Sequence, residues 1–178
     1  MSAAQPRLLH ALLMTPADMG RLGTLGVISS VQRSHACGAY LELSRRVSTD
    51  RNPTRMGDME NAQDHHPGSD SSQFKIMDPM MGYYATVTRL AVKETSPRKS
   101  KGWIPKQIRT RIQALRGMTN DSAYATISES DTESIELGKR PDFVVFSPDT
   151  MHRPAGKITE TRPLTTAVDG RGMSGRKL

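Results

Sequence analysis

Side chains that commonly carry nucleophilic, acid–base or metal chemistry are few in this sequence. The chain has one cysteine, Cys37, and five histidines. It contains no Gly-x-Ser-x-Gly, His-Glu-x-x-His, Cys-x-x-Cys or phosphate-loop pattern. His65 and His66 are adjacent and follow Asp64, but a metal site needs three or four ligands in a fixed geometry. The sequence therefore predicts no catalytic residue, no metal ligand and no cofactor, and it indicates a protein that is not an enzyme.

Hydroxyl side chains in contexts that kinases favour are more numerous. Ser48 follows two arginines and Ser96 precedes a proline, while three further hydroxyls each have an acidic residue three positions later. A phosphate adds about −1.5 to −2 charges and therefore changes how a charged segment binds its partners. The candidate phosphosites are Ser48, Ser96, Tyr124, Thr126, Ser128 and Ser130.

Tyr124 is a candidate because of the six residues around it. The segment Ser122-Ala123-Tyr124-Ala125-Thr126-Ile127 resembles the inhibitory tyrosine motif of immune receptors, Ser-x-Tyr-x-x-Ile. The resemblance implies phosphorylation of Tyr124. In that family the motif lies on the tail of a membrane-spanning receptor, whereas this chain has no apolar stretch of the roughly 18 residues that a membrane helix needs.

The strongest concentration of positive charge lies between residues 81 and 118, where nine basic residues face one acid. Within it, aliphatic residues recur at helical spacing, which predicts an amphipathic helix over residues 103–118. The apolar face, a candidate partner-binding surface, consists of Trp103, Ile104, Ile108, Ile112 and Leu115. The accompanying basic patch consists of Arg98, Lys99, Lys101, Lys106, Arg109, Arg111 and Arg116.

Several partners suit such a helix. Its aliphatic face can enter a groove on another protein, or pack on a small core of its own chain. Trp103 and the basic side also suit an anionic membrane surface. Nucleic acid is a further alternative, with binding that weakens as salt rises.

The sequence has few of the large apolar residues that would pack helices and strands around a preorganised site. Leu, Ile, Val and Phe together make 32 of the 178 residues, below the roughly 20 % that marks chains with a poor core. The formal net charge is +7. We therefore expect a mostly intrinsically disordered chain with short amphipathic α-helices, at most a small β-hairpin, and no extended globular core.

Charge and composition divide the chain into five segments. These are an apolar N-terminal segment (1–47), a linker (48–73), a basic strand-plus-helix segment (74–118), an acidic hydroxyl-rich segment (119–148) and a disordered tail (149–178). Within them we expect a leucine-faced helix over residues 8–13, which also suits a transit peptide, and a helix that starts at Thr15-Pro16. We also expect a strand over residues 83–92 that pairs with residues 143–146.

These features favour a small non-enzymatic regulatory or adaptor protein that binds other proteins through short segments and is tuned by phosphorylation. No small-molecule substrate is expected. One alternative is a mitochondrially imported accessory subunit of a larger assembly, and another is a basic nucleic-acid-binding accessory protein. A single cysteine suits a reducing compartment, so we expect a cytoplasmic or nuclear location, with mitochondria as the alternative.

Overall fold

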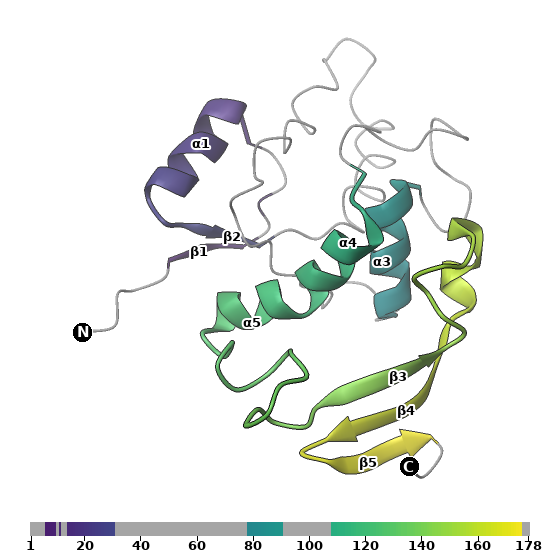
Figure 1. Ribbon diagram of the computed structural model, residues 1–178. Coiled ribbons are helices and arrows are strands. Elements are labelled where there is room, and N and C mark those ends of the chain that lie inside the picture. Colours follow the sequence, from purple (N-terminus) through teal and green to yellow (C-terminus); the bar gives the residue numbers. More distant parts are fainter. Residues whose placement is uncertain (1–5, 10, 12–13, 31–77, 91–107, 176–178) are drawn as a thin grey trace.

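The computed structural model describes residues 6–9, 11, 14–30, 78–90 and 108–175 (Figure 1). These residues form helices, two sheets and a small core, so the expectation of a mostly disordered chain without a globular core is wrong. Cys37, His65, His66 and the linker predicted over residues 48–73 lie outside the described residues. The five segment boundaries stay a prediction.

The N-terminal part combines a short helix with a two-stranded parallel sheet. Strand β1 (Arg7–Leu8) pairs with β2 (Ile28–Ser29), and helix α1 (Pro16–Thr24) connects them. The predicted helix start is confirmed, because the Thr15 hydroxyl accepts a hydrogen bond from the Asp18 amide at 3.2 Å. The predicted leucine-faced helix is wrong at Leu8, which lies in β1. Leu12 and Leu13 lie outside the described residues.

Helix α3 (Pro79–Thr88) occupies residues 83–88 of the strand predicted over residues 83–92, so that prediction is wrong there, and residues 91–92 lie outside the described residues. The Asp78 carboxylate accepts a hydrogen bond from the Met80 amide at 2.9 Å, and proline occupies the first helical position. Arg89, in the left-handed conformation with φ of 56°, ends the helix. The residues that suggested a strand are thus held in a helix by its cap and by burial of Tyr83, Ala85 and Thr86.

Two consecutive helices follow, α4 (Arg111–Met118) and α5 (Asn120–Thr126). Helix α4 starts with a capping box in which Thr110 and Gln113 each bond the other's backbone amide. The helix predicted over residues 103–118 is confirmed from Arg111 onward, and residues 103–107 lie outside the described residues. The buried residue of α4 is Ala114, not a member of the isoleucine face.

The C-terminal part is a three-stranded antiparallel sheet in the order β3-β4-β5, with a 3₁₀-helix before its central strand. The elements are β3 (Phe143–Ser147), η4 (Ala155–Glu160), β4 (Arg162–Val168) and β5 (Arg171–Gly175). The strand predicted at residues 143–146 is confirmed, but its partner is β4. A two-residue turn at Asp169 and Gly170, both with positive φ, joins β4 to β5.

The prediction of a disordered tail is therefore wrong over residues 149–175. Threonine and alanine supply the inward side chains there, with Thr165 and Ala167 buried on one face of β4. The count of core-forming residues included only Leu, Ile, Val and Phe, so it missed threonine and alanine.

The core lies where α3, α4 and η4 meet. Its buried residues are Tyr83, Ala114 and Ile158, and partly buried Tyr84, Val87, Met118 and Ala155 pack against them. Small alanines let the helices approach closely, so few large side chains suffice. Within the described ranges, no helix is long and apolar enough to cross a membrane.

Candidate functional site

The described residues gather polar chemistry where α3, the first turn of α4 and residues 149–153 meet. We call this group, made of Tyr83, Arg111, Asp149, Met151 and His152, the junction cluster. The Tyr83 hydroxyl lies 3.4 Å from the Arg111 carbonyl oxygen and 3.4 Å from the Met151 sulfur. Burial raises the pKa of the Tyr83 hydroxyl, which the Arg111 charge partly opposes. The hydroxyl is therefore a neutral donor at neutral pH.

Arg111 links the helices to the segment that precedes η4. Its guanidinium donates hydrogen bonds to the carbonyl oxygens of Thr150 and Arg153. A guanidinium presents several donors in a fixed fork, so one side chain satisfies two carbonyls of the same turn. Arg111 therefore fixes the position of residues 150–153 against α3 and α4.

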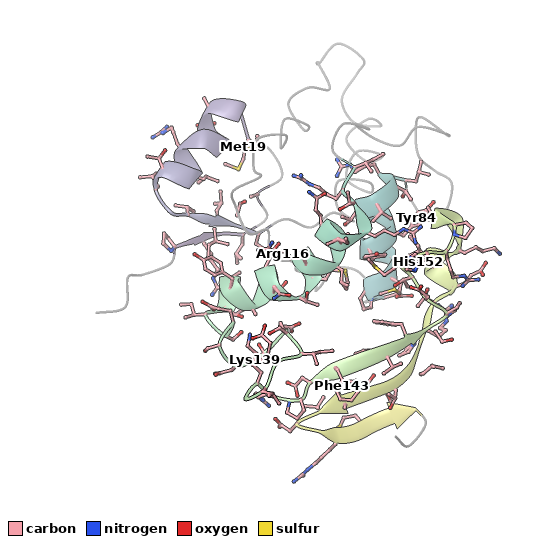
Figure 2. All side chains as sticks on the ribbon, viewed as in Figure 1. Met19, Tyr84, Arg116, Lys139, Phe143 and His152 are labelled. Atoms are coloured by element: carbon pink, nitrogen blue, oxygen red, sulfur yellow. The ribbon has the colours of Figure 1, made fainter. Side chains whose placement is uncertain are left out.

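Asp149 and His152 form an exposed pair within that turn. Their side chains meet at 2.6 Å between Asp149 Oδ2 and His152 Nδ1, and Asp149 Oδ1 accepts a hydrogen bond from the Met151 amide at 2.7 Å. The hydrogen bond with His152, followed by that from Met151, lowers the pKa of the Asp149 carboxyl. Figure 2 shows His152 in the segment that leads into η4.

A carboxylate that orients an imidazole is one part of acid–base catalysis, but more groups are needed. Among the described residues, no hydroxyl or thiol nucleophile is hydrogen-bonded to His152. The pair also provides only two metal donors. Across residues 6–30, 78–90 and 108–175, excluding the gaps at residues 10 and 12–13, no three His, Cys, Asp or Glu side chains are grouped to hold a metal ion.

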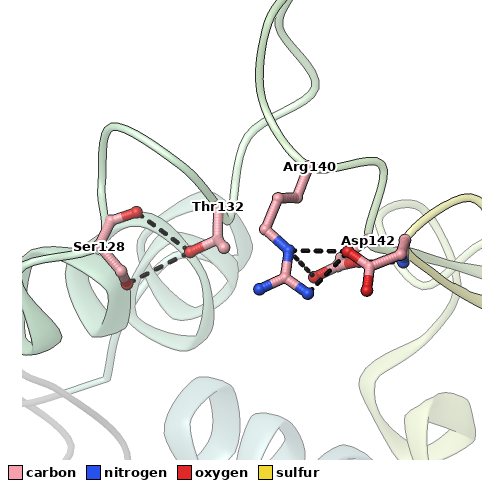
Figure 3. A network of polar contacts seen from close by, with 5 residues as sticks. Ser128, Thr132, Arg140 and Asp142 are labelled. Carbon is pink, nitrogen blue, oxygen red and sulfur yellow. Dashed lines mark hydrogen bonds and ion pairs between the residues drawn. The ribbon is translucent and has the colours of Figure 1, made fainter.

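A second polar network lies in the loop between α5 and β3 (Figure 3). Arg140 bonds Asp169 through two nitrogens, at 2.9 and 2.7 Å, and lies 3.8 Å from Asp142. Ser128 and Thr132 form a neighbouring pair in which the Thr132 hydroxyl donates to the Ser128 carbonyl at 3.2 Å. The Arg140–Asp169 contact joins the loop to the β4–β5 turn, so this network stabilises the loop.

The structure describes only part of the predicted partner-binding face. Trp103 and Ile104 lie outside the described residues. Ile108, Ile112 and Leu115 are exposed, so the described part of the apolar face does not enter the core. Their role in partner binding stays a prediction.

The predicted basic patch is dispersed in the part of the chain that the structure describes. Arg111 donates hydrogen bonds to the Thr150 and Arg153 carbonyls, and Arg116 pairs with Asp121 at 3.1 Å. The Arg109 amide donates a hydrogen bond to the Thr86 carbonyl. Arg98, Lys99, Lys101 and Lys106 lie outside the described residues.

The candidate phosphosites differ in access. Ser130 and Thr126 are exposed, whereas Ser128 and Tyr124 are partly buried. The Thr126 hydroxyl donates back to carbonyls of α5, and Ser128 shares a 2.8 Å contact with it. Ser48 and Ser96 lie outside the described residues. Modification of any of the six stays a prediction.

Sequence reasoning missed Tyr83, Asp149 and His152 as members of a polar cluster. The only local signal is the spacing of Asp149 and His152, an acid and an imidazole three residues apart in a proline-bounded turn. Their approach to Tyr83 depends on packing between segments more than 60 residues apart.

A family model described as the amidohydrolase family matches residues 2–172. The match spans nearly the whole chain. The chain belongs to the amidohydrolase family.

Individual relatives of this amidohydrolase-family chain are distant and much longer. Protein LONG AFTER FAR-RED 3 from Arabidopsis thaliana is 25 % identical over 171 residues, which are 94 % of this chain and 28 % of that protein. A metal-dependent hydrolase from Pyrococcus horikoshii matches in structure with a TM-score of 0.69 and 22 % identity, over 85 % of this chain and 30 % of that one. Guanine deaminase from E. coli matches with a TM-score of 0.56 and 12 % identity, over 96 % and 39 %.

Family membership corrects four expectations drawn from the sequence. A folded amidohydrolase-family chain is not mostly disordered, and the non-enzymatic adaptor is wrong as a function. The family match also makes two further expectations wrong, that the chain is not an enzyme and that it has no small-molecule substrate.

Proposed function

We propose that this chain acts as a metal-dependent hydrolase that cleaves a small molecule at an amide-like carbon–nitrogen bond. The observation that carries the proposal is the family match over residues 2–172. The structural relatives support it, since they include a metal-dependent hydrolase from Pyrococcus horikoshii and an atrazine chlorohydrolase from Arthrobacter aurescens complexed with zinc. A bound metal ion in such a hydrolase polarises the scissile group and activates a water molecule.

The described residues do not fit that metal. They provide no group of three donors, and the Asp149–His152 pair is exposed and already internally bonded. We therefore assign no catalytic step to them. Their role in the proposed hydrolase is to form a scaffold, in which Arg111 and Tyr83 join α3, α4 and the turn before η4.

The test uses the full 178-residue chain, purified with zinc or manganese present. A panel of amides, cyclic amides and amino-substituted heterocycles is incubated with it, and mass spectrometry measures the hydrolysis products. We expect metal-dependent turnover of at least one class, lost on chelation and restored by added metal. A double variant, Asp149→Asn with His152→Asn, is the matched control and should keep both turnover and bound metal. A chain that retains no divalent metal and hydrolyses no class would overturn the proposal.

A further inference from the structure

The turn between β4 and β5 contains two neighbouring residues that can react with each other. Asp169 is the one Asp or Asn in the sequence that precedes a glycine. Both turn residues have positive φ, 50° at Asp169 and 72° at Gly170, and Asp-Gly adopts such turns readily. Because glycine has no Cβ, its backbone nitrogen can approach the preceding carboxyl closely. The turn geometry therefore favours a dipeptide that is chemically labile.

The reaction open to this pair is succinimide formation. The Gly170 backbone nitrogen loses its proton and bonds to Asp169 Cγ, while a carboxyl oxygen leaves as water. A water molecule then opens the ring at one of its two carbonyls. Opening at the side-chain carbonyl restores aspartate, whereas opening at the backbone carbonyl breaks the original peptide bond and leaves isoaspartate. The water lost in the first step is regained in the second, so the mass is unchanged and nothing is oxidised or reduced.

Both reacting groups are bonded to other partners in the structure. Oδ1 of the Asp169 carboxylate accepts hydrogen bonds from Arg140 Nε at 2.9 Å and Arg140 Nη2 at 2.7 Å. The Gly170 N–H donates a hydrogen bond to the Pro141 carbonyl at 3.2 Å. The electrophilic carboxyl and the nucleophilic nitrogen are thus each held by the loop before β3.

A third contact fixes the backbone of the turn. The Asp169 amide donates a hydrogen bond to Asp142 Oδ1 at 2.6 Å, and Asp142 Oδ2 lies 3.8 Å from Arg140 (Figure 3). We call residues 140–142 the turn clasp, because these three consecutive residues hold the carboxylate, the nitrogen and the amide. The side chains of Arg140 and Asp169 are 51 % and 59 % exposed, so water reaches them. Hydrogen bonds therefore protect this turn where burial does not.

We propose that Asp169-Gly170 is a site of isoaspartate formation, and that the turn clasp keeps the normal peptide linkage while the hairpin is folded. The reaction then proceeds only from a local opening in which Arg140 and Pro141 release the turn. Isoaspartate adds one carbon atom to the main chain, so the modified turn no longer supports the pairing of Val168 with Arg171. The proposal is independent of the hydrolase activity.

The experiment follows the chemistry at residue 169 in the full chain. Native and urea-unfolded protein are incubated at neutral pH in water enriched in heavy oxygen, and mass spectrometry analyses the tryptic peptide 158–171. Each passage through the succinimide incorporates one heavy oxygen atom, and electron-transfer fragmentation distinguishes isoaspartate from aspartate. We expect incorporation at least about 10-fold slower in the native chain, because the site reacts only when the turn is open.

Arg140→Met tests the turn clasp itself. It removes both hydrogen bonds to the Asp169 carboxylate, and it should raise the rate of incorporation in the native chain about fivefold, the effect of an exposed ion pair on opening. Arg111→Met is the matched control, because it removes an arginine that bonds residues 150 and 153 and leaves the hairpin contacts in place. Its rate at residue 169 should equal that of the wild-type chain.

Four results would overturn the proposal. Equal rates in native and unfolded protein would show that the fold does not protect the turn, and an unfolded chain without label would show that no succinimide forms. An unchanged rate in Arg140→Met, or an equal rise in Arg111→Met, would show that the turn clasp is not the protecting element. If circular dichroism shows that Arg140→Met fails to fold, Asp142→Ala replaces it, since that change frees the Asp169 amide and should raise the rate likewise.

Discussion

Arg111 is the single side chain on which the junction cluster depends most. Arg111→Met keeps much of the aliphatic length but removes the donors to the Thr150 and Arg153 carbonyls. We expect the free energy of unfolding to fall by about 2–3 kcal/mol, because two carbonyls lose charge-assisted hydrogen bonds. Chemical denaturation measures it. Arg21→Met, which removes an exposed ion pair with Asp18, should cost less than about 1 kcal/mol. Equal losses in the two variants would contradict the role given to Arg111.

Asp149 makes the same turn sensitive to acid. Hydrogen bonds from His152 and Met151 hold the pKa of its carboxyl below the usual value, so the ionised form favours the folded state. That contribution is present above the unfolded-state pKa of about 4 and is lost as pH falls through the lower folded-state value. Asp149→Asn should therefore flatten the decline of the melting temperature at acid pH, as thermal unfolding at a series of pH values would show. His152→Gln should raise the pKa of Asp149 toward its usual value, and an unchanged acid profile in both variants would refute this assignment.

Among the elements, the stability of α3 depends on the cap at its first turn. Asp78→Ala removes the carboxylate that accepts a hydrogen bond from the Met80 amide. We expect a loss of about 1 kcal/mol in the free energy of unfolding. Hydrogen exchange should quicken first at the amides of α3. Thr15→Ala, the corresponding change at α1, should quicken exchange in α1 and leave α3 protected. If both variants affect the same helix, the two caps do not act locally.

The same helix shows how far the sequence can predict elements. Thr15-Pro16 and the strand at residues 143–146 were predictable because a cap and a β-branched run act over a few neighbours. Tyr83 and its neighbours favour a strand by residue type, yet packing on η4 and α4 keeps them helical. The junction cluster was not predictable, since Arg111 and Tyr83 meet residues 149–153 only after the elements pack. A count of large apolar residues misjudged the fold because alanine and threonine fill buried positions.

At the scale of the whole molecule, the described elements should fold without a metal ion. No group of three donors is present among them, so chelation removes nothing that holds α3, α4 or the sheet together. We expect hydrogen-exchange rates of the β4 amides to change by less than about twofold when a chelator is added. Chelation should still abolish the turnover proposed above. A loss of β4 protection on chelation would place a metal ligand within the described scaffold.

The turn between β4 and β5 restricts what a randomised library can contain. A Cβ at Gly170 would lie 3.2 Å from the Pro141 ring, and the φ of +72° strains any other residue. Gly156 and Gly172 have open space around them and no positive φ. Libraries selected for folded chains should therefore return glycine at position 170 and diverge freely at 156 and 172. Deep sequencing of the selected variants should show almost only glycine at position 170 and many residue types at positions 156 and 172.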